Sequence, residues 1–125
     1  MNKVSLGSFY EKVAIKYLKS LKYKILEKNF KTKHGEIDII AYDKKNDCLV
    51  FVEVRYRKNS FFGTPQETVN INKQRKIILS AMWYLKLNSK NFKEFRFDII
   101  SFTDGSNPEH IKDAFQLNLL QKYYI

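Results

Sequence analysis

Two carboxylates stand in apolar segments of the chain that lie close together in the sequence. Asp38 is part of Gly35-Glu36-Ile37-Asp38-Ile39-Ile40, and Glu53 is part of Phe51-Val52-Glu53-Val54-Arg55. An unpaired charge among apolar side chains is unfavourable, so each acid is expected to face a group that neutralises it. A divalent metal ion is a natural candidate, because hard cations bind carboxylate oxygens.

The segment around Glu53 alternates in a way that places further charges beside it. In an extended strand over residues 49–57, Glu53, Arg55 and Arg57 share one face. Carboxylates that hold Mg²⁺ and a nearby cation that offsets developing charge suit phosphodiester hydrolysis. Asp38 would supply a second metal ligand, and the backbone carbonyl of Val54 a further one.

The acids must be positioned by a hairpin and a helix. Apolar runs predict strands over Ile37–Tyr42 and Leu49–Tyr56, joined by the polar turn Asp43–Asp47. Asp38 and Glu53 lie at similar distances from this turn, so antiparallel pairing brings them close. An amphipathic helix is expected over residues 8–21, with Glu11 at the edge of its apolar stripe, where the side chain could face a cleft.

The remaining elements complete an α/β pattern. We expect a weak strand over 23–29, a loop over 58–65, a helix over 72–88 and strands over 95–102 and 110–112, followed by a terminal helical turn. For the second helix, the pattern predicts Asn72 as the N-cap and Ile78, Met82 and Leu85 on one face. This order is typical of a three-layer α/β domain with a mixed central sheet.

Composition limits the class of protein. The 125 residues fit one domain over 1–125, with a core at about 7–115 and a C-terminal extension at 116–125. Cys48 is the only cysteine, so neither an intramolecular disulfide nor a cysteine zinc cluster is available. No run approaches the ~20 apolar residues of a membrane span. We therefore expect a cytoplasmic protein without membrane contacts.

Charge is distributed unevenly along this basic chain, whose net charge is +10. Residues 1–33 hold nine lysines against two glutamates, a net charge of +7. Residues 34–54 hold two lysines against five acids, or −3, and residues 55–76 hold six basic residues against one acid, or +5. An acidic segment between basic ones suits a polyanion held by its phosphates beside a metal held by the acids. The alternative is a basic surface that only keeps the protein soluble.

Several short motifs extend this interpretation over most of the chain. They are Gly7-x-x-x-Glu11-x-x-Ala14, Gly35-Glu36-Ile37-Asp38, Phe51-Val52-Glu53-Val54-Arg55-Tyr56-Arg57, Gly63-x-Pro65, Lys73, Arg96-Phe97-Asp98 and Ile111-Lys112-Asp113-Ala114-Phe115. Together they resemble the signature of the bacterial YraN-like family. That family resembles the archaeal Holliday-junction resolvases and, by that similarity, the restriction-endonuclease-like PD-(D/E)xK superfamily. The resemblance implies a restriction-endonuclease-like αβββαβ core and a metal-dependent endonuclease acting on DNA, with branched or structured DNA as the expected substrate.

The resemblance also implies roles for individual residues. Glu11, Asp38 and Glu53 would bind Mg²⁺ or Mn²⁺, and Arg55 would join them as a catalytic group. Arg55 stands where the superfamily usually has lysine; arginine stays protonated and cannot act as a base, but it can stabilise charge through a bidentate contact. Lys73 could take the place of the missing lysine. The residues expected to contact nucleic acid are Arg55, Arg57, Lys73, Arg75 and Lys33.

Alternatives remain at this stage. Asp38 and Glu53 could be solvated or paired with Arg55 and Arg57 across the hairpin. Glu36 could be a further ligand or could bind a backbone amide near Gly35. Arg96 and Asp98 share a strand face and are expected to pair with each other. The aromatic residues Tyr56, Phe61 and Phe62 could stack on an unpaired base or simply pack in the core.

At the level of function, a nucleic-acid-binding protein with weak or no cleavage is the main alternative to a nuclease. An interaction module that docks an acidic protein is a third reading. The protein could act as a monomer or as a homodimer, since junction resolvases cut two strands as symmetric dimers.

Overall fold

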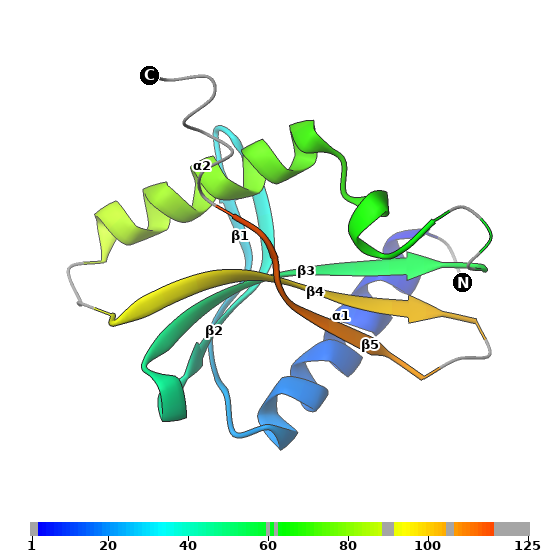
Figure 1. Ribbon diagram of the computed structural model, residues 1–125, viewed down its shortest axis with the longest axis horizontal. Coiled ribbons are helices and arrows are strands. Elements are labelled where there is room, and N and C mark those ends of the chain that lie inside the picture. The colour runs from blue at the N-terminus through cyan, green and yellow to red at the C-terminus, as the bar shows by residue number, and fades with distance from the viewer. Residues whose placement is uncertain (1–2, 60, 62, 89–91, 105–106, 117–125) are drawn as a thin grey trace.

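A sheet of five strands in the order β1-β2-β3-β4-β5 runs through the described part of the protein (Figure 1). The computed structural model describes residues 3–59, 61, 63–88, 92–104 and 107–116. The strands are β1 (Lys24–Thr32), β2 (Gly35–Asp43), β3 (Cys48–Arg57), β4 (Glu94–Thr103) and β5 (Glu109–Phe115). The helices are α1 (Lys3–Ser20) and α2 (Ile71–Leu87), with short 3₁₀ turns η1 (Lys44–Asn46) and η2 (Gln66–Thr68). No helix among these residues is long and apolar enough to cross a membrane.

The sheet is mixed, as the element order predicts. β1, β2 and β3 form an antiparallel meander, β3 and β4 are parallel, and β5 returns antiparallel to β4. A parallel pair requires a crossover connection, which here contains α2. The result is an α/β fold consistent with a restriction-endonuclease-like core.

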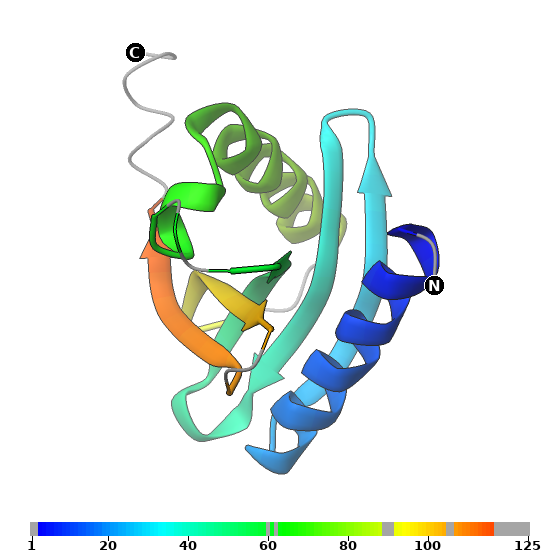
Figure 2. The same ribbon diagram turned by 90° about the vertical axis from the view of Figure 1, so that its right-hand side faces the viewer.

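The two helices cover opposite faces of the sheet (Figure 2). Ala14 and Leu18 of α1 pack on Ile39, Val50 and Val52, all fully buried. On the other face, α2 packs over a second cluster that includes Ile37, Phe51, Ile77, Ile78 and Phe97. Two apolar layers therefore sandwich the hairpin that carries Asp38 and Glu53, which gives the acids a rigid support.

Several details of the sequence-based prediction need correction. The N-cap of α2 is Asn70, whose side chain accepts a hydrogen bond from the Lys73 amide at 2.9 Å; Asn72 already lies inside the helix. Met82 is exposed, because the buried face of α2 is formed by Ile77, Ile78, Ser80, Ala81 and Tyr84. Strands β1 and β5 are longer than predicted. The predicted terminal helical turn lies outside the described residues, as do Ser60 and Phe62 of the predicted loop.

A buried polar network joins β5 to the rest of the sheet. Asp98 is fully buried and accepts hydrogen bonds from Arg96 Nε at 3.0 Å and from the Asp113 amide at 3.0 Å. Its other oxygen lies 2.7 Å from Nε2 of His110, and Nδ1 of His110 lies 3.0 Å from the hydroxyl of Tyr17 in α1. The expected pairing of Arg96 with Asp98 is thus observed, within a wider network than the sequence indicated.

Candidate functional site

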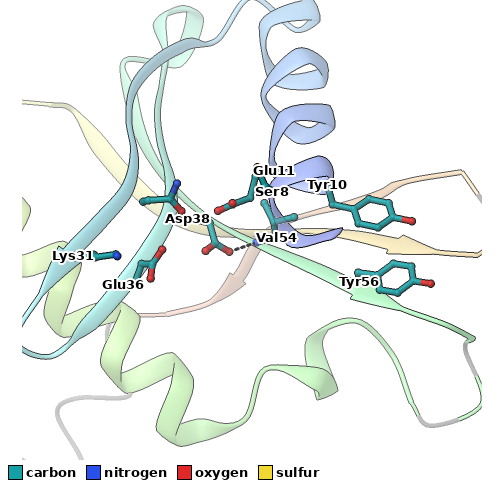
Figure 3. Close-up of a pocket in the computed structure, with 10 residues that line it drawn as sticks. Ser8, Tyr10, Glu11, Lys31, Glu36, Asp38, Val54 and Tyr56 are labelled. Atoms are coloured by element: carbon teal, nitrogen blue, oxygen red, sulfur yellow. Dashed lines mark hydrogen bonds between the residues drawn. The ribbon is translucent and has the colours of Figure 1, made fainter. Parts of the chain in front are cut away.

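The site lies where strands β2 and β3 separate. Their pairing ends at Ile39 opposite Val52, so Asp38 and Glu53 occupy the next positions on the two strands. In place of a further ladder bond, Asp38 Oδ2 accepts a hydrogen bond from the amide of Val54 at 2.8 Å (Figure 3). The strands therefore open into a fork, with one acid on each branch.

Three carboxylates gather on the α1 side of this fork. Glu11 of α1 and Glu36 and Asp38 of β2 each offer one oxygen, and these oxygens lie within 4.8 Å of one another. They line a cavity of about 500 Å³ between α1 and the β1–β2 hairpin (Figure 3). Two oxygens bound to one Mg²⁺, Mn²⁺ or Ca²⁺ ion lie at most ~5 Å apart. The spacing therefore fits a single hard cation.

The amide of Asn29 in β1 connects two of these acids. With its side chain in the orientation that satisfies its neighbours, Asn29 Nδ2 donates to Glu11 Oε1 at 2.8 Å and to Glu36 Oε1 at 3.0 Å. Asn29 has a positive φ of 53°, which asparagine tolerates better than most residues. The left-handed backbone conformation of Asn29 was not predicted, because the pattern of apolar and polar residues does not depend on the sign of φ.

Burial and mutual repulsion raise the pKa of Glu11 above its ordinary value. Desolvation is the largest cause, followed by the charges of Asp38 and Glu36, while the ammonium of Lys28 acts in the opposite direction. Carboxylates that repel one another in a partly desolvated site favour either a proton or a cation. The electrostatics of the cavity thus suit a positively charged ligand.

Glu53 lies deeper than the other acids, on the α2 side of the fork. Its side chain is 3% exposed, and burial together with the neighbouring Asp38 raises its pKa to about 9. Oε2 accepts no hydrogen bond from the described residues, although Lys73 Nζ of α2 lies 3.5 Å away as an ion pair. A buried carboxylate oxygen without a hydrogen-bond donor among the described residues, on a side chain beside Asp38, fits a ligand for a hard divalent ion.

The two predicted arginines on β3 contact the segment that follows the strand. Arg55 donates to the carbonyl of Thr68 in η2 at 2.9 Å, and Arg57 donates to the carbonyl of Gly63. Both side chains are half-buried. They lie on the face of β3 opposite Val54 and Tyr56, which line the acidic cavity. In this structure the arginines anchor the connection between β3 and α2.

The other predicted nucleic-acid contacts are spread over neighbouring elements. Lys73 lies beside Glu53, and Arg75 is half-buried on α2. Lys33 lies in the exposed turn between β1 and β2. Lys31 was not predicted, but it lines the acidic cavity together with Tyr10 and Tyr56, whose rings stack at 4.7 Å. The structure therefore brings Glu11, Glu36 and Asp38 together and sets the Glu53–Lys73 pair beside Asp38. Arg75 and Lys33 lie elsewhere on the surrounding elements.

The mixed sheet, its two covering helices and an acidic fork between antiparallel strands define an α/β protein consistent with the restriction-endonuclease-like class. Comparison with known proteins then gives the family. The model of Uncharacterised protein family UPF0102 matches residues 10–102. The chain belongs to this family, which corresponds to the YraN-like family that its motifs resemble.

Relatives cover almost the whole chain. A UPF0102 protein of Clostridioides difficile is 47% identical over 116 residues, which span 92% of this chain and 100% of the relative. A UPF0102 protein of Sulfurihydrogenibium sp. is 39% identical over 117 residues, which span 94% and 99% of the two chains. One from Geotalea daltonii is 47% identical over 90% of this chain.

Proposed function

We propose that this protein is a metal-dependent endonuclease that hydrolyses phosphodiester bonds in DNA, with branched or structured DNA as its substrate. The observation that carries the proposal is the buried Glu53 oxygen, which accepts no hydrogen bond from the described residues and belongs to a side chain beside Asp38, the acid whose oxygen clusters with those of Glu11 and Glu36. The net charge of +10 and the resemblance to junction resolvases add support. A buried acidic site in a basic protein is expected where phosphates and a cation meet.

Asp38, Glu53 and Glu11 would hold Mg²⁺ or Mn²⁺, with Glu36 as an additional ligand. When bound, such an ion supplies Lewis acidity toward the phosphate and lowers the pKa of water. Asn29 and the Val54 amide orient the carboxylates through hydrogen bonds to Glu11, Glu36 and Asp38. Metal binding requires oxygen donors that rigid elements hold in place, and α1, β2 and β3 carry these side chains.

Lys73 is the cation best placed to act with the acids. Its ammonium group lies 3.5 Å from Glu53, and its side chain is 40% exposed, so it can reach both the acid and a bound phosphate. We assign to it the charge-stabilising role that the superfamily lysine usually fills from the position of Arg55. Arg55, which donates to Thr68, acts as a positioning residue for the segment that leads into α2.

The proposal is tested by hydrolysis of Holliday-junction, flap and single-stranded DNA with Mg²⁺ or Mn²⁺. Asp38→Ala and Glu53→Ala are expected to abolish cleavage. Glu109→Ala, which removes an exposed acid from β5, serves as the matched control and is expected to leave cleavage unchanged. Equal activity in all variants would identify a contaminating nuclease and contradict the proposal.

A second candidate function is nucleic-acid binding without efficient cleavage. It is favoured by one observation: Arg55 replaces the usual lysine, and its guanidinium is engaged by the Thr68 carbonyl. This candidate predicts salt-sensitive binding without metal-dependent turnover. Arg55→Lys discriminates between the two, because a gain of cleavage would point to a weakened active site.

A further inference from the structure

The exposed side of α2 carries an aromatic platform between two lysines. Trp83 is 40% exposed, and the ammonium groups of Lys33 and Lys86 lie 6.0 and 5.6 Å from the centre of its ring. Lys86 belongs to the same helix, whereas Lys33 comes from the turn between β1 and β2. A large aromatic ring left partly open to solvent between two cations is the composition of a nucleic-acid stacking site.

The approach of the turn to the helix is fixed by the fold. The hydroxyl groups of Thr32 and Ser80 lie 2.8 Å apart and join the hairpin to α2. Gly35, with φ of +154°, lies so close to the helix that an added Cβ would be 3.1 Å from Cβ of Lys76. The backbone of Lys33 is therefore held beside α2 by its neighbours on both sides, which makes the platform a preformed feature.

The same hairpin also borders the acidic cavity. Lys31, two residues before Lys33, lines that cavity together with Glu36 and Asp38. Figure 2 shows the turn of the β1–β2 hairpin beside α2 and its β1 edge beside α1. Lys31 and Lys33 thus provide successive positive charges that lead from the acids to Trp83.

We propose that Trp83 stacks on an unpaired base of nucleic acid, while Lys33 and Lys86 bind the adjacent phosphates. This inference rests on the proposed function, because it assumes a nucleic-acid substrate, and it specifies that the substrate has a single-stranded segment next to the cleavage site. In a duplex both faces of each internal base are covered by neighbouring pairs. Away from the duplex ends, only an unpaired or flipped base can therefore offer a face to the indole.

A purely structural role for the platform makes a different prediction. If the two lysines serve only to fasten the hairpin to α2 through cation–π contacts, removal of the ring lowers stability and leaves DNA affinity unchanged. Stacking lowers affinity for single strands and leaves affinity for blunt duplexes unchanged. The two roles are therefore separated by comparing two DNA substrates with the same variants.

Trp83 is the only tryptophan of the chain, so its fluorescence reports on the platform directly. In EDTA, which prevents cleavage, addition of a single-stranded oligothymidylate is expected to quench this fluorescence. A blunt duplex, in which only the two terminal pairs expose a face, is expected to quench it much less. By fluorescence anisotropy of labelled DNA, Trp83→Leu is expected to weaken single-strand binding about 5- to 150-fold, the range that corresponds to loss of one stacked base. Duplex binding should change less than about twofold.

Two variants make the comparison decisive. Trp83→Phe retains a ring and is expected to restore most of the single-strand affinity. Leu87→Ala removes another exposed large side chain of α2, 61% exposed, and is expected to change neither affinity. Thermal melting verifies that each variant is folded.

Lys33→Gln and Lys86→Gln should each reduce the slope of log affinity against log salt by about 1.

DNA binding without quenching of Trp83, or equal single-strand affinity for Trp83→Leu and the wild type, would overturn the proposal that Trp83 stacks on a base. That result would leave the metal-dependent nuclease unaffected, because the acids and Lys73 are tested by cleavage. Absence of any DNA binding at low salt would overturn both proposals. Quenching by the duplex to the same extent as by the single strand would also reject an unpaired base as the ligand.

Discussion

At the scale of single residues, Glu53 is the acid whose protonation is coupled most strongly to folding. Burial and Asp38 raise its pKa from 4.5 to about 9, so the metal-free folded protein keeps a proton that the unfolded chain loses near its ordinary pKa. The contribution of Glu53 to stability is therefore fully present below the unfolded pKa and is lost as the pH rises toward the folded pKa. We expect the melting temperature in EDTA to fall more steeply between pH 5 and 8 for the wild type than for Glu53→Gln.

Circular dichroism melts at several pH values measure this difference. Glu109→Gln, at an exposed position of β5, is the control and should follow the wild type. Parallel curves for Glu53→Gln and the wild type would mean that Glu53 ionises in the folded protein as it does in the unfolded chain.

Metal binding should reverse the pH dependence that Glu53 gives to the melting temperature. An ion that binds the carboxylates displaces their protons, so its affinity rises with pH, and binding to the native state alone raises the melting temperature. We expect Mn²⁺ to stabilise the wild type more at pH 8 than at pH 6, and to have little effect on the Asp38→Asn and Glu53→Gln double variant. An equal shift for the double variant would place the ion elsewhere on the protein.

Lys73 offers a test of catalysis at a side chain that is not a metal ligand. We expect Lys73→Gln to reduce cleavage roughly 10²-fold, the range found when one charge-stabilising group is removed. Lys76→Gln, one turn further along the same helix and exposed, removes the same charge and should change the rate little. The measurement is single-turnover cleavage at saturating protein, which separates the chemical step from binding. Equal losses in both variants would indicate a general charge effect.

At the scale of elements, the sequence predicted the hairpin well and the fork less well. Apolar alternation located β2 and β3, and their shared turn correctly placed Asp38 next to Glu53. Periodicity could not reveal that pairing stops at Ile39, because the interruption depends on the Asp38 carboxylate taking the Val54 amide. Arg55 and Arg57 likewise contact the carbonyls of Thr68 and Gly63, which lie beyond the end of β3. The alternation of residues within the strand carries no information about these contacts.

At the start of α2, backbone geometry decides which of two nearby asparagines is the N-cap. Asn70 and Asn72 both suit an N-cap by residue type, but Asn70 has extended backbone and accepts from the Lys73 amide. We expect Asn70→Ala to lower the free energy of unfolding by about 1 kcal/mol, the usual cost of a lost cap, whereas Asn72→Ala should leave it unchanged or raise it slightly, because alanine has the higher helix propensity inside the helix. Urea denaturation measures both. A larger loss for Asn72→Ala would move the helix start by two residues.

At the scale of the whole molecule, the net charge of +10 and the acidic fork act against each other on a phosphate backbone. Under the proposed function the lysines and arginines attract DNA, and each phosphate contact contributes a slope of about −0.9 to log affinity against log salt. Binding is therefore expected to weaken roughly tenfold or more between 50 and 200 mM salt, which corresponds to about two or more contacts.

In the proposed nuclease, the carboxylates repel the scissile phosphate until a cation neutralises them. In EDTA, Asp38→Asn is thus expected to bind junction or single-stranded DNA more tightly than the wild type. Addition of Ca²⁺ should bring the wild type up to the affinity of the variant, because the ion supplies the missing positive charge. Anisotropy titrations at one fixed ionic strength measure the difference, with Glu109→Gln as the matched charge change outside the fork. A stronger gain for Glu109→Gln than for Asp38→Asn would mean that DNA passes along β5 and away from the acids.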